Sequence, residues 1–408
     1  MSGYIISLQI LFIYGILAQT SLGLSPVIFV PGDGGAQVEA KLNKTSVVHY
    51  ICHKTSDFSN IWLNLEELVP GVIDCWVDNM RLEYDNVTRT TRSPDGVVIR
   101  FPGWGTSEPV EWLDPSHAQA GAYFNTIADS LVRNVGLKRN VSILGAPYDF
   151  RKAPNEHSEF FVNFKTLVED TYLANNKTPV TLIVHSMGGL MASHFLRLQR
   201  QSWKDQYIRR MISLSTPWAG SVKAIKAFAA GDDLGSRMLS GSTMRTQQIT
   251  CPSLAWLLPS PLFWKSDEVL VQTEKFNYTI KDLQKYFSDI DVPNAWEMRK
   301  DVEKYILEVT APGVEVHCVY GYNISTVERL VYKPRTWLDG NLTLAMGDGD
   351  GTVNLRSLTA CEHWRKRRVI AKSNAGKMVK VVPLATAEHL TILHDQRVID
   401  YINIVMKQ

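Results

Sequence analysis

The sequence predicts an α/β protein in which helices cover both faces of a mainly parallel β-sheet. Short apolar runs alternate with segments of helical periodicity through the first half of the chain, as in parallel sheets that are buried on both faces. The clearest unit is a β-branched and aliphatic strand at 180–184, which runs into His-Ser-Met-Gly-Gly before a helical pattern at 190–198. The other elements are predicted around this strand, turn and helix.

The remaining elements follow the same alternation. A strand at 26–30 leads into a glycine-rich loop at 31–35, and a change to helical, Pro- and Trp-containing pieces predicts an insertion at 222–312 that caps the sheet. Because ligands collect at the carboxyl ends of parallel strands, the loops after the strands are the expected site. Further strands are predicted at 97–101, 141–145, 211–215, 314–321 and 379–384, and helices at 124–135, 160–173 and 391–405.

Composition indicates a globular protein with a large core. The 408 residues are 45% hydrophobic and include 11 Trp, and the formal net charge of +2 gives no indication of a nucleic-acid partner. The one dense basic run, at 363–368, is interpreted as a solvated helix face, and contact with anionic lipid is the alternative.

The N-terminus predicts a secretory signal peptide. The apolar stretch at 4–18 is too short to span a bilayer and precedes small residues, so 1–23 is interpreted as a signal cleaved near Gly23, and 24–408 as the mature chain. An uncleaved anchor is the alternative, since no Lys or Arg precedes the apolar stretch. Glycosylation sequons agree with a secretory route, and they lie at Asn43, Asn86, Asn140, Asn176, Asn277, Asn323 and Asn341.

The 5 cysteines, in an oxidising compartment, predict two disulfides and one remaining thiol. Their spacing leaves the pairing open, but proximity favours Cys52–Cys75 and Cys318–Cys361, which leaves Cys251 as a buried thiol. The first of these loops is dense in apolar residues, which predicts either a small subdomain with a face for lipid or a buried mini-core.

The turn after the 180–184 strand matches a nucleophile elbow. In such a turn a serine, here Ser186, stands between strand and helix, and the N-terminus of the helix points at it. Small neighbours are needed because the backbones come close, and Gly188 and Gly189 supply them, whereas Val184 occupies a position that is usually Gly. The alternative is an ordinary strand, turn and helix with a chance serine.

An acid and a base should follow such a serine in the chain. The glycine-rich loop at 346–353 holds two carboxylates, Asp348 and Asp350, and it fails the EF-hand pattern, so no metal or other cofactor is expected. Among the downstream histidines, His389 lies in the turn directly after the last predicted strand, where the base should be.

Several motifs spread over the chain share the pattern of one enzyme family. They lie at 30–35 (Val-Pro-Gly-Asp-Gly-Gly), 48–50 (Val-His-Tyr), 61–65 (Ile-Trp-Leu-Asn-Leu), 73–76 (Ile-Asp-Cys-Trp), 145–149 (Gly-Ala-Pro-Tyr-Asp), 185–188 (His-Ser-Met-Gly), 347–353 (Gly-Asp-Gly-Asp-Gly-Thr-Val) and 388–389 (Glu-His). With these motifs the chain resembles the lecithin:cholesterol acyltransferase family, most closely its lysosomal phospholipase A2 (group XV) branch.

The resemblance implies an α/β-hydrolase fold with a Ser186–Asp350–His389 triad and oxyanion N–H groups from Asp33 and Met187. It also implies the disulfides Cys52–Cys75 and Cys318–Cys361. A membrane-binding subdomain is expected around the first disulfide, at 46–101, with contact residues Trp62, Leu63, Leu65 and Leu68.

The resemblance further implies the reaction. The chain is expected to bind a phospholipid membrane surface, cleave an acyl ester of a glycerophospholipid donor through an acyl-enzyme, and pass the acyl group to water or to a lipid alcohol such as ceramide. The expected location is the lysosome or the extracellular space. A phosphatidylcholine-sterol acyltransferase and a non-catalytic lipid-binding glycoprotein are the alternatives.

Asp33 adds an expectation about pH. An ionised carboxylate beside an oxyanion hole opposes the developing negative charge, so activity should be higher in acid than at neutral pH. The alternative is an Asp33 side chain that points into solvent.

Overall fold

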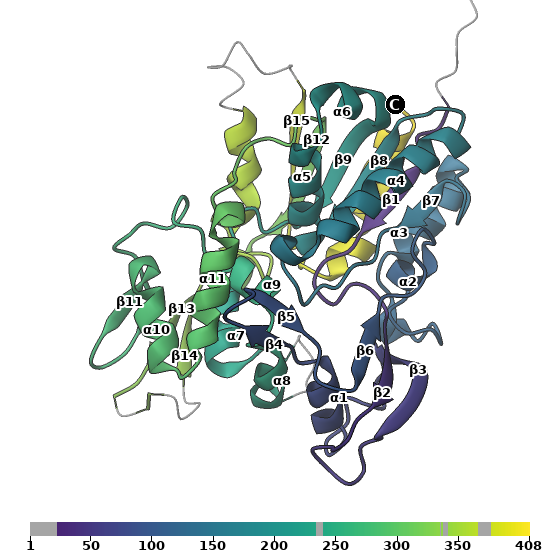
Figure 1. Ribbon diagram of the computed structural model, residues 1–408. Coiled ribbons are helices and arrows are strands. Elements are labelled where there is room, and N and C mark those ends of the chain that lie inside the picture. Colours follow the sequence, from purple (N-terminus) through teal and green to yellow (C-terminus); the bar gives the residue numbers. More distant parts are fainter. Residues whose placement is uncertain (1–22, 234–239, 335, 338–341, 366–376) are drawn as a thin grey trace, which may run out of the picture.

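A six-stranded parallel sheet forms the centre of the molecule. The computed structural model describes residues 23–233, 240–334, 336–337, 342–365 and 377–408 (Figure 1). The strand order is β15-β12-β9-β8-β1-β7, and each neighbouring pair is parallel. The strands are β1 (Val27–Val30), β7 (Ile143–Gly145), β8 (Val180–His185), β9 (Ile208–Leu214), β12 (Val316–Tyr322) and β15 (Val379–Ala385).

Side chains of the central strands alternate between two hydrophobic cores. In β8, Leu182 and Val184 join the core under one set of helices, whereas Ile183 joins the core on the opposite face. Helices therefore cover both faces, as the apolar strand sequences predict (Figure 1). The first set includes α4 (Ser158–Ala174) and α5 (Met187–Leu198), and the second includes α3 (Asn125–Ser130) and α14 (Gln396–Met406).

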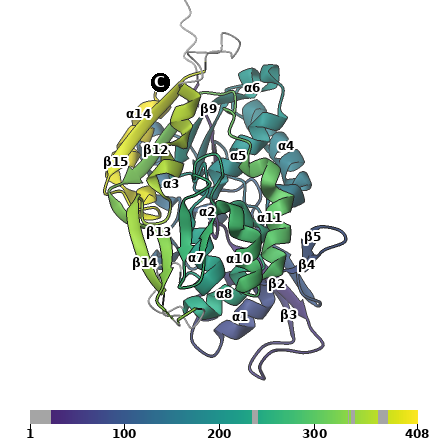
Figure 2. The same ribbon diagram turned by 90° about the vertical axis from the view of Figure 1, so that its left-hand side faces the viewer.

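The cap over the sheet is larger than the predicted insertion. It contains a second sheet of order β11-β10-β13-β14, to which a later hairpin, β13 (Ile324–Tyr332) and β14 (Leu342–Gly349), contributes two strands. Figure 2 shows this hairpin beside α7. The elements within 222–312 are α7 (Val222–Ala230), α8 (Gly241–Gln248), α9 (Pro252–Trp256), β10 (Val269–Gln272), β11 (Asn277–Thr279), α10 (Leu283–Asp289) and α11 (Pro293–Ile306).

A separate antiparallel unit holds the strand predicted at 97–101. This strand, β6 (Val97–Arg100), pairs with β2 (Val38–Asn43), which also pairs with β3 (Thr55–Trp62), and it lies outside the parallel sheet. The unit continues through α1 (Ile73–Met80) and a hairpin, β4 (Glu83–Asp85) and β5 (Thr90–Arg92). It packs on the cap through contacts between α1 and α8.

Short helices complete the connections. The helix predicted at 124–135 ends as a π-turn at Leu131–Val135, and the helix predicted at 391–405 begins with a separate turn at Thr391–His394. The other short helices are η1 (Gln119–Gly121), α2 (Glu108–Glu111), η3 (Pro154–Glu156), α6 (Gln201–Tyr207), η4 (Ile280–Asp282), α12 (Leu355–Leu358) and η5 (Thr359–Cys361).

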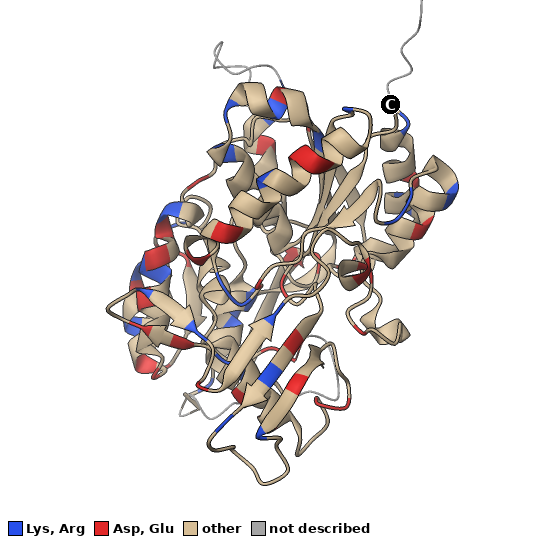
Figure 3. Ribbon diagram, turned by 45° about the vertical axis from the view of Figure 1, so that its right-hand side comes forward, with Lys and Arg blue, Asp and Glu red and all other residues tan. Residues whose placement is uncertain are grey.

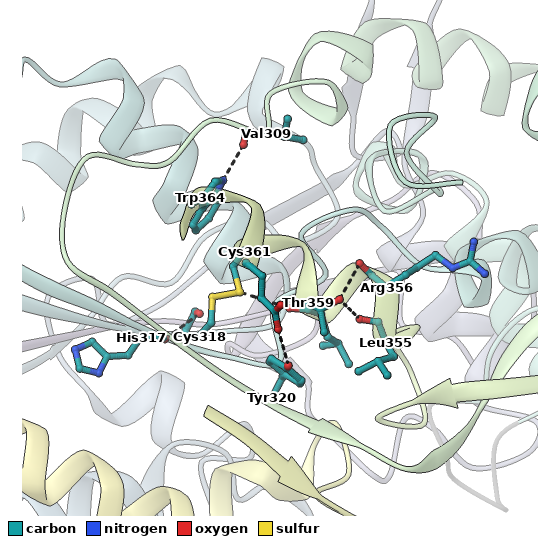
Figure 4. Close-up of a disulfide and its surroundings, with 12 residues drawn as sticks. Val309, His317, Cys318, Tyr320, Leu355, Arg356, Thr359, Cys361 and Trp364 are labelled. Carbon is teal, nitrogen blue, oxygen red and sulfur yellow. Dashed lines mark hydrogen bonds between the residues drawn. A yellow bond between two sulfur atoms is a disulfide. The ribbon is translucent and has the colours of Figure 1, made fainter. Parts of the chain in front are cut away.

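Two disulfides join elements that are separate in the chain. Cys52–Cys75 ties the β2–β3 loop to α1, and Cys318–Cys361 ties β12 to the turn after α12, as Figure 4 shows. These are the two pairs predicted from the sequence. Cys251 is a buried free thiol.

The surface bears charges of both signs. Figure 3 shows Lys and Arg interspersed with Asp and Glu over the elements in view. Within the described ranges, no helix is long and apolar enough to cross a membrane. Residues 1–22 of the predicted signal peptide, the sequon at Asn341 and half of the basic run, 366–368, lie outside these ranges. The other predicted sequon asparagines are all exposed.

Candidate active site

Ser186 stands at a strained turn between β8 and α5. Its φ of +51° and ψ of −129° place it in a region that residues with a Cβ rarely adopt, as in a nucleophile elbow. The turn is crowded, since a Cβ on Gly188 would lie 2.3 Å from the carbonyl oxygens of Val30 and Pro31. Only glycine therefore permits this approach of α5 to the end of β1. Val184, the departure from the usual motif, is buried in the core below.

The serine, histidine and aspartate singled out from the sequence form one hydrogen-bonded chain. His389 Nε2 lies 3.0 Å from Ser186 Oγ, and His389 Nδ1 lies 2.8 Å from Asp350 Oδ2. Because an ionised carboxylate only accepts hydrogen bonds, Nδ1 carries the proton and Nε2 is free to accept the hydroxyl proton of Ser186. The arrangement can activate a serine nucleophile.

Asp350 is held ionised although it is fully buried. Burial by itself raises the pKa of this carboxyl, but His389 and the N–H groups of Thr352 and Val353 outweigh burial, so its pKa stays below the usual value. The other carboxylate of the predicted loop, Asp348, lies in β14 and accepts a hydrogen bond from the backbone of Asn323 instead. Asp350, the second carboxylate, is therefore the one that orients His389.

The glycine-rich loop after β1 lies directly against Ser186. A Cβ on Gly32 would lie 2.8 Å from Ser186 Cβ, so the backbone at 32–33 is close to the serine. Met187 follows Ser186 at the start of α5, which directs its N–H groups toward the same region. The two predicted oxyanion residues are thus each next in the chain to a residue at this turn, Asp33 to Gly32 and Met187 to Ser186.

Asp33 is an exposed residue, and other protein groups lie close to its carboxyl. Loss of bulk water and the nearby charge of Asp232 raise the pKa of Asp33 to about 7, and a hydrogen bond from the Gly34 backbone opposes this shift. The group is therefore mostly neutral in acid and mostly ionised above neutral pH.

Two of the residues predicted to contact a membrane belong to the core instead. Trp62 is 7% exposed and donates its indole N–H to the Gly34 carbonyl at 2.7 Å, and Leu68 is 5% exposed. The prediction is wrong for these two residues because the indole and the leucine fill the space behind the glycine-rich loop and α1. Leu63 is partly buried. Leu65 is exposed, together with Val48, Tyr50 and Ile51 near the first disulfide.

Charged residues of the cap also reach this region, and the sequence did not indicate them. Lys223 on α7 contacts Asp232 at 3.0 Å and lies 3.4 Å from the hydroxyl of Thr352 in the Asp350 loop. Lys226 lies 3.6 Å from Asp232. No sequence pattern distinguishes such lysines from those of any solvated helix face. Among the described residues, no cluster of His, Cys, Asp or Glu could hold a metal ion.

Comparison with known proteins gives a match over most of the chain. The lecithin:cholesterol acyltransferase family model matches residues 57–309 and 303–396. The human lysosomal phospholipase A and acyltransferase is 41% identical over 93% of this chain and 90% of its own length. The chicken (Gallus gallus) phosphatidylcholine-sterol acyltransferase is 40% identical over 84% of this chain and 82% of its own length.

A solved structure shares the fold. A chain of the Tle4–Tli4 complex covers 94% of this chain and 98% of its own length with a TM-score of 0.57, at 13% identity. At this identity the likeness concerns the fold alone. Together with the parallel sheet and the strained elbow, it identifies the fold as that of an α/β hydrolase, as the sequence predicted.

Proposed function

The chain belongs to the lecithin:cholesterol acyltransferase family, and on that premise we propose that it is a serine phospholipase A and O-acyltransferase. Membership makes it an enzyme of lipid hydrolysis and acyl transfer. The proposal adds the donor, a glycerophospholipid, and the acceptor, which is water or a lipid alcohol such as ceramide. The observation that carries the proposal is the hydrogen-bonded chain from Ser186 through His389 to Asp350.

In the proposed reaction, His389 Nε2 takes the Ser186 hydroxyl proton as Oγ attacks the acyl carbonyl. Asp350 stabilises the imidazolium, and the N–H groups of Asp33 and Met187 donate to the oxyanion of the tetrahedral intermediate. The imidazolium then protonates the leaving lysophospholipid oxygen, which leaves an acyl-enzyme.

The second half reverses these steps with a new nucleophile. His389 takes the proton of a water or alcohol O–H, whose oxygen attacks the acyl-enzyme, and the proton returns to Ser186 as the product leaves. Water gives a fatty acid, whereas a lipid alcohol gives an acylated lipid. No metal or other cofactor is required in any step.

The membrane contact is proposed for the exposed apolar residues beside the first disulfide. Val48, Tyr50, Ile51 and Leu65 form this set, which replaces the one predicted from sequence, and it would hold the enzyme at the phospholipid surface. We place the enzyme in the lysosome, as the name of the human relative suggests, or outside the cell.

A sterol acyltransferase is the second candidate, and it is favoured by the 40% identity to the chicken phosphatidylcholine-sterol acyltransferase. A non-catalytic lipid-binding role is disfavoured, because a binder has no need for a serine in a strained conformation with a hydrogen-bonded histidine.

The test is acyl release and transfer from labelled phosphatidylcholine in liposomes that contain a short-chain ceramide and cholesterol, at about pH 5 and about pH 7.5. We expect fatty acid and acylceramide, more in acid, and loss of at least about a thousandfold in Ser186→Ala. Cholesteryl ester as the main product would favour the sterol acyltransferase. Products that persist in Ser186→Ala would contradict the proposed nucleophile.

A further inference from the structure

A buried tyrosine and histidine connect the loops on either side of Ser186. The Tyr123 hydroxyl lies 3.0 Å from the Gly32 backbone nitrogen and is hydrogen-bonded to His185 Nδ1. The other ring nitrogen of the histidine, Nε2, lies 2.9 Å from the carbonyl oxygen of His389. Both side chains are 2% exposed.

The backbone groups at the two ends of this chain of hydrogen bonds, the Gly32 N–H and the His389 carbonyl, determine which atom carries each proton. A carbonyl oxygen only accepts, so His185 Nε2 carries a proton and donates it to His389. In a neutral imidazole the other nitrogen then accepts, and therefore the Tyr123 O–H donates to Nδ1. The Tyr123 oxygen in turn accepts the Gly32 N–H, so each of these polar groups is paired.

The side chains keep these protonation states over a wide pH range. Burial, and next the charge of nearby His389, lower the pKa of His185 to about 3, so its ring stays neutral in acid. Burial raises the pKa of Tyr123 above its usual value, so its hydroxyl stays protonated at neutral pH. The hydrogen-bond directions are thus the same across the conditions in which the enzyme is expected to work.

The residues joined by these hydrogen bonds adjoin or include the groups of the site whose relative positions matter for the reaction. Gly32 precedes Asp33, the proposed oxyanion donor after β1, while His185 precedes the nucleophile at the end of β8. His389 is the proposed base, in the loop after β15. A shift of about 1 Å among such groups is enough to cost about a hundredfold in rate.

We propose that Tyr123 and His185 act together as positioning residues, which hold the oxyanion loop and the His389 loop at their working distance across Ser186. This proposal rests on the proposed function of Ser186 and His389. Both side chains are buried, so neither is expected to touch the substrate. Their effect on the rate comes through the backbone of Gly32 and His389.

Tyr123→Phe tests the proposal because it removes only the hydroxyl. The matched control is Tyr401→Phe, since the Tyr401 hydroxyl is also hydrogen-bonded to a buried histidine ring, at 2.6 Å from His317 Nδ1. His317 lies on β12, which β9 separates from β8 and Ser186 in the sheet. The measurements are kcat and KM for phosphatidylcholine hydrolysis, the rate of Ser186 labelling by a fluorophosphonate, and the melting temperature.

For Tyr123→Phe we expect kcat and the labelling rate to fall about ten- to a hundredfold while KM changes less than about twofold. For Tyr401→Phe we expect both rates to stay within about twofold, with a similar fall in melting temperature. Equal rate losses in the two variants would overturn the proposal. Labelling of wild-type Ser186 without phospholipid turnover would instead contradict the proposed function, and the labelling rates would still test the positioning role.

His185→Gln gives a second, independent test. If the two side chains act as one unit, the double variant with Tyr123→Phe should be no slower than the slower single variant, since the connection is already broken. Additive losses would contradict a joint role. Failure of both single variants to fold at the assay temperature would also overturn the proposal, because the pair would then serve stability.

Discussion

At the residue scale, Asp33 has a backbone N–H that would stabilise an oxyanion and a side-chain carboxylate that would repel it. Its backbone N–H is proposed to donate to an oxyanion, while its own side chain is an acid whose pKa is raised to about 7 by partial desolvation and by the charge of Asp232. As the pH rises through this value the carboxyl becomes ionised, and a negative charge close to the oxyanion disfavours the transition state. The proton on Asp33 is therefore expected to favour the reaction.

Asp33→Asn should remove the loss of activity at the neutral end of the pH profile. In the wild type, kcat/KM should fall as pH rises through about 7, whereas in the variant it should fall little, because the amide carries no charge. The measurement is kcat/KM from about pH 4 to about pH 8. Asp348→Asn, the same change in an aspartate that is not bonded to His389, is the control and should leave the profile unchanged. An unchanged profile in Asp33→Asn would exclude this role.

At the scale of elements, the turn between β3 and α1 places an acid beside the exposed apolar residues. Glu67 is partly buried, one of its carboxyl oxygens has no hydrogen-bond partner, and burial raises its pKa to about 7. Leu65 of the same turn is 47% exposed. An ionised Glu67 next to the surface that is proposed to enter lipid would be costly, so the neutral form of Glu67 should favour membrane contact.

Vesicle binding should therefore be tighter in acid and depend on Glu67. For phosphatidylcholine vesicles we expect about a tenfold gain in affinity from about pH 8 to about pH 5. Glu67→Gln, neutral throughout, should bind at the higher pH as tightly as the wild type does in acid. The neighbouring, exposed Glu66 gives the control Glu66→Gln, which should retain the pH dependence. Sedimentation with Ser186→Ala protein would measure binding without turnover.

At the scale of the whole molecule, Arg151 joins three parts of the structure, which are the parallel sheet, the antiparallel unit that continues through α1, and the cap. Its guanidinium donates to both carboxyl oxygens of Asp149, in the loop after β7, and to the carbonyl of Met80 at the end of α1. Its own carbonyl accepts from Ser253 of α9 in the cap. The Arg151 side chain is 2% exposed and that of Asp149 is 17% exposed, so loss of the cation would leave a mostly buried Asp149 charge without its partner.

Arg151→Gln should consequently lower the free energy of unfolding by about 3–5 kcal/mol. The control is Arg397→Gln, whose ion pair with Asp395 lies at the surface and should contribute at most about 1 kcal/mol. Urea unfolding followed by tryptophan fluorescence measures both. A loss in Arg151→Gln no larger than in Arg397→Gln would contradict a joining role.

Much of the architecture could be predicted from local sequence. The strands at the centre of the sheet, the elbow at Ser186 and both disulfide pairs are found where they were expected. Periodicity encodes the strands and the elbow because each depends on neighbours within a few residues. The disulfide pairs were instead favoured by the spacing of the cysteines, since their partners lie 23 and 43 residues apart. The strand at 97–101 was assigned to the wrong sheet, because alternation identifies a strand but not the sheet that it joins. The β13–β14 hairpin was missed.

The sequence by itself determined the fold class, the strained serine, and the loops that hold an acid and a base. Only the tertiary structure decided that Trp62 belongs to the core, and that Tyr123 and His185 link the Gly32 loop to His389. The physical reason is distance along the chain, since Ser186 and His389 are 203 residues apart. Their contact depends on strand order and loop packing, which are set by the burial of the whole chain and have no local pattern.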